Sequence, residues 1–307
     1  MRASAWIAVA RRAILGDPEA DCERFRDTLR VAKEAASRVL RRGERVHLER
    51  GDVIAEIDEE WGGRLASLRI GDLSVLVPRR SDPLLWGAYV MAPWAGRIRN
   101  AEFVFDGQRH ALPRRLPEWA IHGTVLDRRA DQADEPAPHR ARHVLSLGED
   151  WPFAGRLAQE IALHEDGLDW TLALHADDAP FPASLGWHPW FPRRLARGGE
   201  AELDFHAARV YERGPDGLPT GEFVVPAVGP WDDCFVDLAG PPTIRWPGAL
   251  ELTLSSDVDH WVVYDEPEDA LCVEPWSGPP DALNIAQRRV EPGAPLTASF
   301  KMRWRRD

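Results

Sequence analysis

From residue 46 onward, apolar and polar positions alternate in short runs, which is the pattern of half-buried β-strands. The clearest run covers residues 168–175, where Leu, Trp, Leu and Leu alternate with Asp, Thr, Ala and His. The apolar run 157–163 precedes it across the turn sequence His-Glu-Asp-Gly at 164–167, so we predict a β-hairpin here. A similar alternation over residues 296–304 predicts a strand near the end of the chain.

Turn residues separate these runs throughout the same region. Phe103 and Phe105 lead into the dipeptide Asp106-Gly107, which indicates a second hairpin. The chain holds 26 prolines and 24 glycines, and no long helical period occurs after residue 44. Many short strands between frequent turns predict one all-β domain, either an antiparallel sandwich or a barrel. The polar, proline-containing stretch 127–142 is predicted to be a surface loop.

Residues 17–43 follow a helical period instead. Asp17 is a suitable N-cap, Pro18 suits the first helical turn, and Gly43 is a typical helix terminator. Apolar residues recur at spacings of three and four along one face, namely Phe25, Leu29, Ala32, Ala36 and Leu40. We therefore predict an N-terminal helical extension over residues 1–44, appended to a β-sandwich domain over residues 45–307.

Charge and cysteine content narrow the class of protein. The net charge of −12 repels phosphate backbones and anionic lipids, so we expect neither nucleic acid nor a membrane as a partner. Three cysteines without CxxC spacing give no disulfide framework and no zinc site. The apolar run 3–10 is too short for a signal peptide, and no later stretch reaches the ~18 apolar residues of a transmembrane helix. We expect a cytoplasmic protein.

Five stretches place polar side chains among aromatic and apolar neighbours. In chain order they are Pro93-Trp94-Ala95-Gly96-Arg97-Ile98, Ile121-His122-Gly123, Gly186-Trp187-His188-Pro189-Trp190-Phe191, Trp231-Asp232-Asp233-Cys234-Phe235, and residues 272–284 with Glu274 and Trp276. Singly, Arg97 suits a surface ion pair, His122 a turn and Asp232 a turn cap. An imidazole buried between aromatics needs a hydrogen-bond partner, so His188 is harder to explain by structure alone. Glu274 ends an apolar strand.

Together and in this order, the stretches resemble the motifs of the aldose 1-epimerase (galactose mutarotase) family, in the form of its shorter bacterial-type subgroup. The matching segments are Arg97-Ile98 with the turn Asp106-Gly107, His122-Gly123, His188-Pro189-Trp190-Phe191, Asp232-Asp233-Cys234-Phe235, and Glu274 followed by Pro280-Asp281-Ala282-Leu283-Asn284. Thr124 stands where the family often has a second glycine, and Trp190 where it often has tyrosine. The resemblance covers about residues 48–305.

The resemblance implies a large antiparallel β-sandwich, a supersandwich, with its site in a groove across one sheet. It implies that His188 is the general acid at the sugar ring oxygen and Glu274 the general base at O1. The α and β anomers of a free aldose would then interconvert by ring opening and reclosure. An imidazole suits this role because its ordinary pKa lies near neutrality.

The same resemblance assigns the binding residues. His122, Arg97 and Asp232 would hold the sugar hydroxyls, and either Trp190 or Trp276 would stack on the ring. The chemistry requires no metal, nucleotide or other cofactor. The expected partner is a small sugar, and the chain is expected to be a monomer or a homodimer.

Four alternatives remain open at this point. The substrate could be a hexose 6-phosphate, since arginine pairs occur at 114–115, 128–129 and 193–194. The protein could be a carbohydrate-binding or sensor protein without catalysis, although that role needs no proton donor and acceptor together. Asp232 and Glu274 could be the carboxylate pair of a glycoside hydrolase. His122, His188 and Glu274 could bind zinc, although their spacing gives no support for it.

Overall fold

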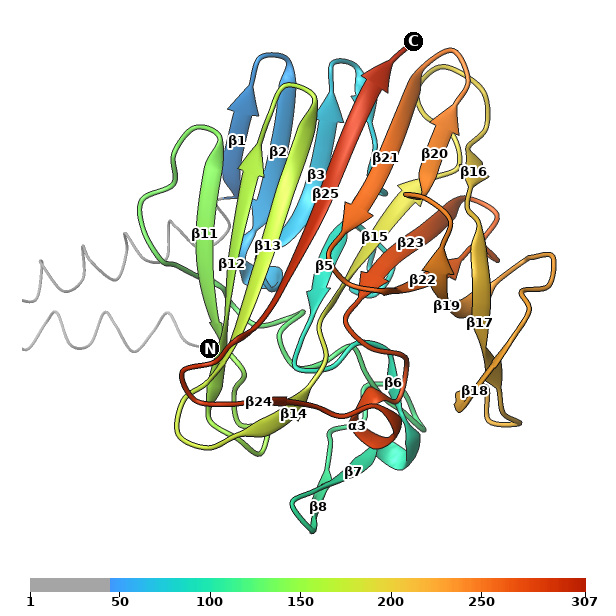
Figure 1. The fold of residues 1–307 in the computed structure, drawn as a ribbon. Helices are drawn as coiled ribbons and strands as arrows, with labels where there is room; N and C mark the ends of the chain where they lie inside the picture. The colour runs from blue at the N-terminus through green and yellow to red at the C-terminus, as the bar shows by residue number, and fades with distance from the viewer. Residues whose placement is uncertain (1–44) are drawn as a thin grey trace, which may run out of the picture. The chain divides into compact units, whose positions relative to one another are not determined.

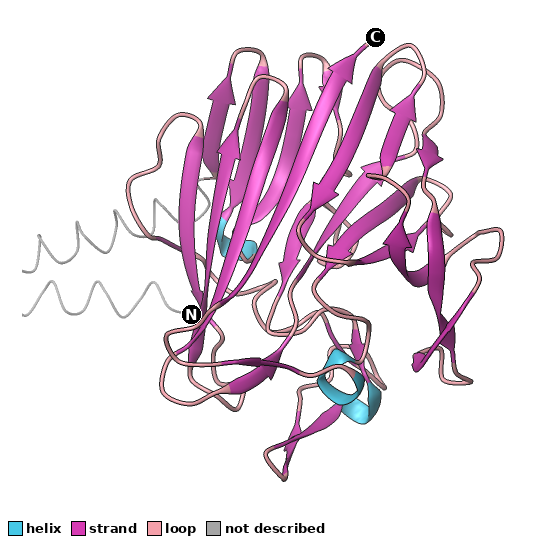
Figure 2. Ribbon diagram, viewed as in Figure 1, coloured by secondary structure: helices cyan, strands magenta, loops and turns pink. Residues whose placement is uncertain are grey.

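The structure is a computed structural model that describes residues 45–307. The predicted N-terminal helical extension, residues 1–44, lies outside the described residues. Strands make up most of this part of the chain (Figure 2). Its helical segments are short, namely η1 (Glu59–Trp61), η2 (Arg99–Ala101) and α3 (Ala282–Ile285). None of its helices is both long enough and apolar enough to cross a membrane. The prediction of an all-β fold is confirmed.

Two large sheets form the body of the described part of the chain. The eleven-stranded sheet runs in the order β1 (Val46–Arg50), β2 (Val53–Asp58), β3 (Arg64–Ile70), β5 (Ala88–Met91), β15 (Gly186–Pro192), β23 (Ala270–Trp276), β22 (His260–Tyr264), β19 (Asp232–Leu238), β17 (Ala207–Arg213) and β18 (Pro219–Val224), with β4 (Leu73–Ser74) paired to β3. The eight-stranded sheet runs β10 (Asp131–Gln132), β11 (Arg140–Ser146), β12 (Gly155–Leu163), β13 (Gly167–Ala176), β25 (Leu296–Arg306), β21 (Leu250–Ser256), β20 (Thr243–Trp246) and β16 (Glu202–Asp204).

Three two-stranded pairs complete the fold. They are β14 (Phe181–Ala183) with β24 (Arg288–Val290), β6 (Arg97–Ile98) with β9 (Ala120–Ile121), and β7 (Glu102–Phe105) with β8 (Gln108–Ala111). Every pairing between these named strands is antiparallel, as the turn-rich sequence predicts. Figure 1 shows the eight-stranded sheet lying in front of the other large sheet.

The main core lies between the two large sheets. Trp187 on β15 contacts Trp170 on β13, with ring centroids 6.4 Å apart, and Phe300 on β25, at 5.6 Å. All three side chains are fully buried. Packing the apolar faces of two sheets against each other is the usual way in which antiparallel sheets bury their surface. This core fixes the position of β15 in the fold.

The opposite face of the eleven-stranded sheet carries a second buried cluster. Side chains alternate between faces along a strand, so Trp187 enters the main core while its neighbour His188 points to the other side. The second cluster holds four aromatic residues and both cysteines of the described chain: Trp86, Tyr89, Trp190, Trp276, Cys234 and Cys272. The period-2 pattern thus separates a structural face from a face with polar groups.

The strand predictions are largely confirmed. The hairpin across 164–167 joins β12 to β13, and the Asp106-Gly107 turn joins β7 to β8, with positive φ at both turn residues. The last predicted strand is β25. The predicted loop over 127–142 is partly wrong, because β10 lies within it and β11 begins at Arg140. His143 is buried against Glu59, 3.2 Å away, so a polar residue occupies a position where the pattern calls for an apolar one.

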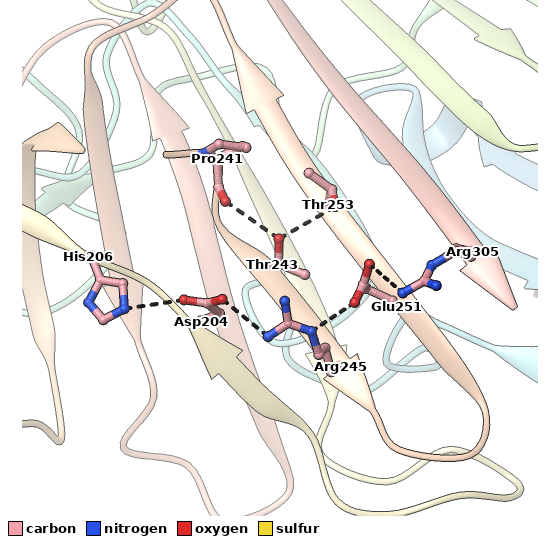
Figure 3. A network of polar contacts seen from close by, with 8 residues as sticks. All are labelled: Asp204, His206, Pro241, Thr243, Arg245, Glu251, Thr253 and Arg305. Carbon is pink, nitrogen blue, oxygen red and sulfur yellow. Dashed lines mark hydrogen bonds and ion pairs between the residues drawn. The ribbon is translucent and has the colours of Figure 1, made fainter. Parts of the chain in front are cut away.

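A ladder of ion pairs crosses the eight-stranded sheet (Figure 3). Arg245 on β20 donates hydrogen bonds to Asp204 on β16 at 3.1 Å and to Glu251 on β21 at 2.8 Å. Arg305 on β25 donates to the other oxygen of Glu251 at 3.3 Å. Pairs as exposed as these contribute about 0–1 kcal/mol each to stability. Removing the charge of Glu251 should therefore cost little.

Candidate active site

Strand pairing brings His188 on β15 opposite Glu274 on β23. The pairs on either side of this position are Gly186 with Trp276 and Trp190 with Cys272. Counting two residues inward from either pair matches His188 with Glu274. On the other edge of β15, His188 pairs with Tyr89 of β5. Residues opposite each other on neighbouring strands point to the same face, so a tyrosine, a histidine and a glutamate form one row across the sheet.

This row lines a cavity of about 320 Å³. That volume lies within the range of pockets that hold small ligands. The walls include all seven site residues predicted from the sequence, namely Arg97, His122, His188, Trp190, Asp232, Glu274 and Trp276. The three arginine pairs considered for phosphate binding, residues 114–115, 128–129 and 193–194, do not line it. The cavity therefore collects the predicted residues from five separate stretches of the chain.

His188 and Glu274 contact each other directly. The distance from His188 Nε2 to Glu274 Oε1 is 3.4 Å, and the side chains are 8% and 2% exposed. The imidazole is held between two aromatic rings. The ring of Tyr89 stacks on it at 4.8 Å and that of Trp190 at 5.2 Å. A stacked ring has little rotational freedom, so Nε2 stays directed at the carboxyl group.

Trp276 holds the other oxygen of Glu274. Its Nε1–H donates to Oε2 at 3.1 Å. The two residues are separated by one position on β23, so they share a face of the sheet. With one oxygen facing the imidazole and the other bonded to the indole, the carboxyl group is fixed in orientation.

Burial sets the protonation of this pair. Desolvation lowers the pKa of His188 well below its usual range, and the adjacent His122 adds to the effect. Desolvation raises the pKa of Glu274 well above its usual range; the Trp276 N–H opposes this rise, and the charge of Asp232 adds to it. Both shifts disfavour charge in a site of low polarity. Both directions favour the neutral forms of the pair, a protonated Glu274 beside a neutral imidazole.

His122 occupies a turn that needs an unusual backbone. Its own φ is 60°, and that of Gly123 is 73°. A Cβ at Gly123 would lie 2.0 Å from the carbonyl oxygen of Ala92, the residue that follows β5. Only glycine therefore fits at this position. The His-Gly pair recognised in the sequence therefore has a structural cause, because the glycine lets the chain approach β5 closely enough to place the histidine.

The protonation of His122 is also defined. The backbone N–H of Gly96 donates to His122 Nδ1 at 3.3 Å. Burial lowers the pKa of His122 to about 3, with Arg97 and Arg115 contributing to the shift. A neutral imidazole whose Nδ1 accepts carries its proton on Nε2. His122 is thus a neutral hydrogen-bond donor in the cavity wall.

Arg97 and Asp232 form an ion pair at the cavity wall. The guanidinium donates to the Asp232 carboxylate at 3.3 Å, and both side chains are about one-third exposed or less. Desolvation raises the pKa of Asp232, while the charge of Arg97 opposes that rise. The guanidinium also lies over the ring of Trp119, with its central carbon 5.8 Å from the ring centroid. The two charged groups offer both donors and acceptors to a polar ligand.

The segment Pro280–Asn284 holds the Arg97 strand in place. The backbone N–H of Asp281 donates to the carbonyl of Arg97 at 2.9 Å. The buried Asp281 carboxylate accepts from the backbone N–H of Arg99 at 3.0 Å and from Asn284 at 2.7 Å. The Asp and Asn of this motif are therefore structural residues that position a cavity wall, and they do not line the cavity themselves.

Trp190 and Trp276 are almost completely covered, at 2% and 3% exposure. Trp190 stacks on His188, and Trp276 bonds to Glu274. Both rings reach the cavity wall, but most of their surface is occupied by contacts within the protein. Besides His188 and Glu274, their neighbours include Tyr264, whose ring lies 5.9 Å from that of Trp190, and His122, 6.3 Å from the ring of Trp276.

Sequence reasoning missed the tyrosines. The chain has three, Tyr89, Tyr211 and Tyr264, and all three line the cavity. Tyr89 lies four residues before the Pro93 stretch, but Tyr211 lies about 20 residues from the motifs on either side, so no common signal marked the three. Arg213 also lines the cavity and donates to Asp233 at 2.7 Å.

Within residues 45–307, one group of side chains has the residue types of a metal site. His188, Cys272 and Glu274 offer ligand atoms within 4.8 Å of one another, a different trio from the one that the sequence suggested. A metal binds the thiolate and the carboxylate, not their protonated forms. Burial raises the pKa of the Cys272 thiol and of the Glu274 carboxyl well above their usual ranges. Burial thus favours the protonated thiol and carboxyl, and a metal ion would have to displace both protons.

Comparison with known proteins agrees with the fold. The family model for aldose 1-epimerase matches residues 45–234. The chain therefore belongs to the aldose 1-epimerase family. The matched range includes His122 and His188 and ends before Glu274, so the glutamate is assigned to the site by its geometry.

Individual relatives are distant in sequence. The uncharacterized protein YihR of Escherichia coli strain K12 is 27% identical over 289 residues, which cover 85% of this chain and 93% of that protein. A galactose mutarotase-like protein from Clostridium acetobutylicum superposes with a TM-score of 0.76 at 15% identity, covering 86% and 95% of the two chains. A galactose 1-epimerase from Lactobacillus acidophilus superposes with a TM-score of 0.71 at 14% identity, covering 85% and 94%. At these identities the structures share the fold.

Proposed function

We propose that this protein is an aldose 1-epimerase, an isomerase that interconverts the α and β anomers of a free aldose. The observation that carries the proposal is the contact between His188 and Glu274, 3.4 Å apart in a cavity of sugar size. Mutarotation needs one proton delivered to the ring oxygen and one removed from the C1 hydroxyl. A pair that shares a single proton has the stoichiometry that this exchange requires.

The proton first moves from Glu274 to His188. That transfer gives a carboxylate base and an imidazolium acid with no change in net charge. Glu274 then takes the proton of the C1 hydroxyl while His188 protonates the ring oxygen, so the bond between C1 and the ring oxygen breaks. Rotation about the C1–C2 bond presents the other face of the aldehyde, and the reverse transfers close the ring. The Trp276 N–H on Glu274 stabilises the carboxylate stage.

The remaining wall residues suit the hydroxyls of a neutral sugar. His122 donates through Nε2, and the Arg97–Asp232 pair supplies donors and acceptors. We propose that Trp190 and Trp276 act mainly by orienting the acid–base pair, since little of either ring is exposed. Any stacking of the sugar then falls to a ring edge of these residues or to another wall residue.

A free aldose fits the cavity better than a hexose 6-phosphate. The wall holds two arginines, Arg97 and Arg213, and each already donates to a neighbouring aspartate. Glu266 and Glu274 add further acidic groups, so a phosphate dianion would meet more carboxyl groups than cations. The arginine pairs at 114–115, 128–129 and 193–194 lie elsewhere.

The residues also favour an isomerase over a binding protein and over a glycoside hydrolase. A binding protein has no need to bury a histidine against a carboxyl group, because that arrangement costs desolvation of both. In a glycoside hydrolase the two acids flank the scissile bond. Here the second acid, Asp232, is paired with Arg97, and Glu274 faces an imidazole.

The test is the rate of anomeric exchange, measured by NMR magnetisation transfer on a panel of free aldoses and of hexose 6-phosphates. The proposal predicts faster exchange for at least one free aldose and a weaker effect on each matched 6-phosphate. Faster exchange for 6-phosphates alone would overturn the choice of substrate. Line broadening by bound sugar without faster exchange would instead identify a binding protein.

A further inference from the structure

A second chain of polar residues ends in the cavity wall and takes no part in the acid–base pair. It runs from Asp259 through His260 to Tyr211, and His260 Nδ1 lies 2.7 Å from a carboxylate oxygen of Asp259. His260 Nε2 lies 3.1 Å from the hydroxyl of Tyr211. Tyr211, on β17, lines the cavity, while His260, on β22, does not. The two strands are far apart in sequence and belong to one sheet.

These contacts determine which atom carries each proton. A carboxylate only accepts, so the bond to Asp259 requires a proton on His260 Nδ1. In the neutral imidazole Nε2 then has no proton and accepts from the Tyr211 hydroxyl. The phenol is left with its lone pairs free and its proton engaged. In this state the Tyr211 hydroxyl can accept a hydrogen bond and cannot act as a donor.

Packing keeps the arrangement in place. The rings of Tyr211 and His260 are nearly parallel, at 19° with centroids 5.8 Å apart, and the ring of Phe223 packs against that of Tyr211 with centroids 4.4 Å apart. Burial lowers the pKa of His260, Asp259 opposes this shift and Arg288 adds to it, so the imidazole is neutral near pH 7. The charged or titratable groups acting on Tyr211 are Cys234, Asp259 and Arg209.

We propose that Tyr211 is a specificity-determining residue that accepts a hydrogen bond from one ring hydroxyl of the sugar, and that Asp259 and His260 are positioning residues that fix it as an acceptor. This inference rests on the proposed function. It adds a rule of recognition, namely that the sugar must carry, at one ring carbon, a hydroxyl group that donates a hydrogen bond to Tyr211. A sugar whose hydroxyl there is missing, or is replaced by a group that only accepts, loses this bond.

The experiment compares monodeoxy and monodeoxyfluoro analogues of the best substrate, with exchange measured for wild type, Tyr211→Phe and the matched control Tyr264→Phe. Fluorine accepts weakly and cannot donate. For one ring position, wild type should show KM raised about 10-fold by both the deoxy and the fluoro analogue, with kcat changed much less. Tyr211→Phe should raise KM for the parent sugar, and the deoxy and fluoro analogues at that ring position should raise its KM no further. Tyr264→Phe, which leaves Tyr211 in place, should keep the rise in KM at that ring position.

A second variant tests the role of the positioning residues. Asp259 is 80% exposed, so Asp259→Ala should fold normally while releasing the His260 tautomer. Nitrogen-15 chemical shifts of the His260 imidazole should show a proton on Nδ1 in wild type and a mixture of tautomers in the variant. The rise in KM caused by the fluoro analogue at the same ring position should be smaller in the variant. A proton on Nε2 in wild type would overturn the inference. So would identical analogue patterns in wild type and Tyr211→Phe while wild type remains active. If wild type exchanges no sugar, the proposed function fails and this inference fails with it.

Discussion

Trp276 and Glu274, two residues apart on one strand, are joined by a hydrogen bond from the indole N–H to Oε2 at 3.1 Å. This bond lowers the pKa of Glu274 against the larger rise caused by burial. In the proposed mechanism, the indole would support the Glu274 carboxylate that forms when the proton moves to His188. A contact that acts on one protonation state can be tested through the pH dependence of the reaction.

Replacing Trp276 by Phe removes this donor and keeps an aromatic ring. The Glu274 pKa should rise further, so the alkaline limb of the pH profile of kcat/KM should move to higher pH. At neutral pH we expect kcat/KM to fall about 10-fold, the effect of losing one hydrogen bond to a charged group. A fall without any shift of the alkaline limb would mean that Trp276 only shapes the cavity.

The wild-type pH profile should be a broad bell. The pair works while it holds one proton between His188 and Glu274. Acid adds a second proton only below the lowered pKa of His188, and alkali removes the single proton only above the raised pKa of Glu274. The plateau of kcat/KM should therefore extend well below about pH 6.5, the ordinary pKa of histidine. An acid limb centred at about 6.5 would contradict this protonation scheme.

Gly123 should tolerate no side chain. A Cβ would overlap the Ala92 carbonyl at 2.0 Å, and φ is 73°. Gly123→Ala should lose about 3 kcal/mol or more of unfolding free energy in urea, because backbone on both sides has to shift. Gly240→Ala is the matched control, since a Cβ there meets nothing within 4 Å, and it should change stability by less than about 1 kcal/mol. Equal effects would show that the turn at His122 is not constrained as described.

His122 should make the protein sensitive to acid. Its pKa is about 3 in the folded state and about 6.5 when unfolded, so the unfolded chain binds more protons as the pH falls below 6.5. Stability is lost over that interval by about 1.4 kcal/mol per pH unit for this one group. His122→Asn keeps an acceptor for the Gly96 N–H and removes the titration. Urea unfolding at about pH 6.5 and about pH 5 should show a loss smaller by about 2 kcal/mol in the variant. Equal losses of unfolding free energy in wild type and His122→Asn would contradict the low pKa of His122.

Much of the fold followed from local patterns. The turns at Asp106-Gly107 and 164–167 and the alternation of 168–175 predicted two hairpins because their signals lie within a few residues. The strand β11 was missed because His143 takes an inward position, where its partner Glu59 is distant in sequence. A buried polar residue interrupts the alternation of apolar and polar positions, and its hydrogen-bond partner cannot be recognised when that partner is distant in sequence.

The candidate site was predictable for a different reason. His188 and Glu274 were selected because five stretches together resemble the aldose 1-epimerase motifs; taken singly, only His188 was hard to explain by structure alone. Their contact depends on the pairing of β15 with β23, which no local pattern specifies. The link between Tyr211 and His260 likewise depends on the arrangement of β17 and β22 in the sheet. The motif at Pro280–Asn284 was recognisable, but its task of holding Arg97 was visible only in three dimensions.

The most direct test of the central claim compares Glu274→Gln and His188→Asn with wild type in anomeric exchange of the best free aldose. Glu251→Gln is the matched control, since it makes the same chemical change on the sheet that does not line the cavity. We predict that each site variant loses at least about 100-fold in kcat while Glu251→Gln keeps the wild-type rate. Exchange at the wild-type rate in either site variant would contradict the assignment of this pair as the acid and base.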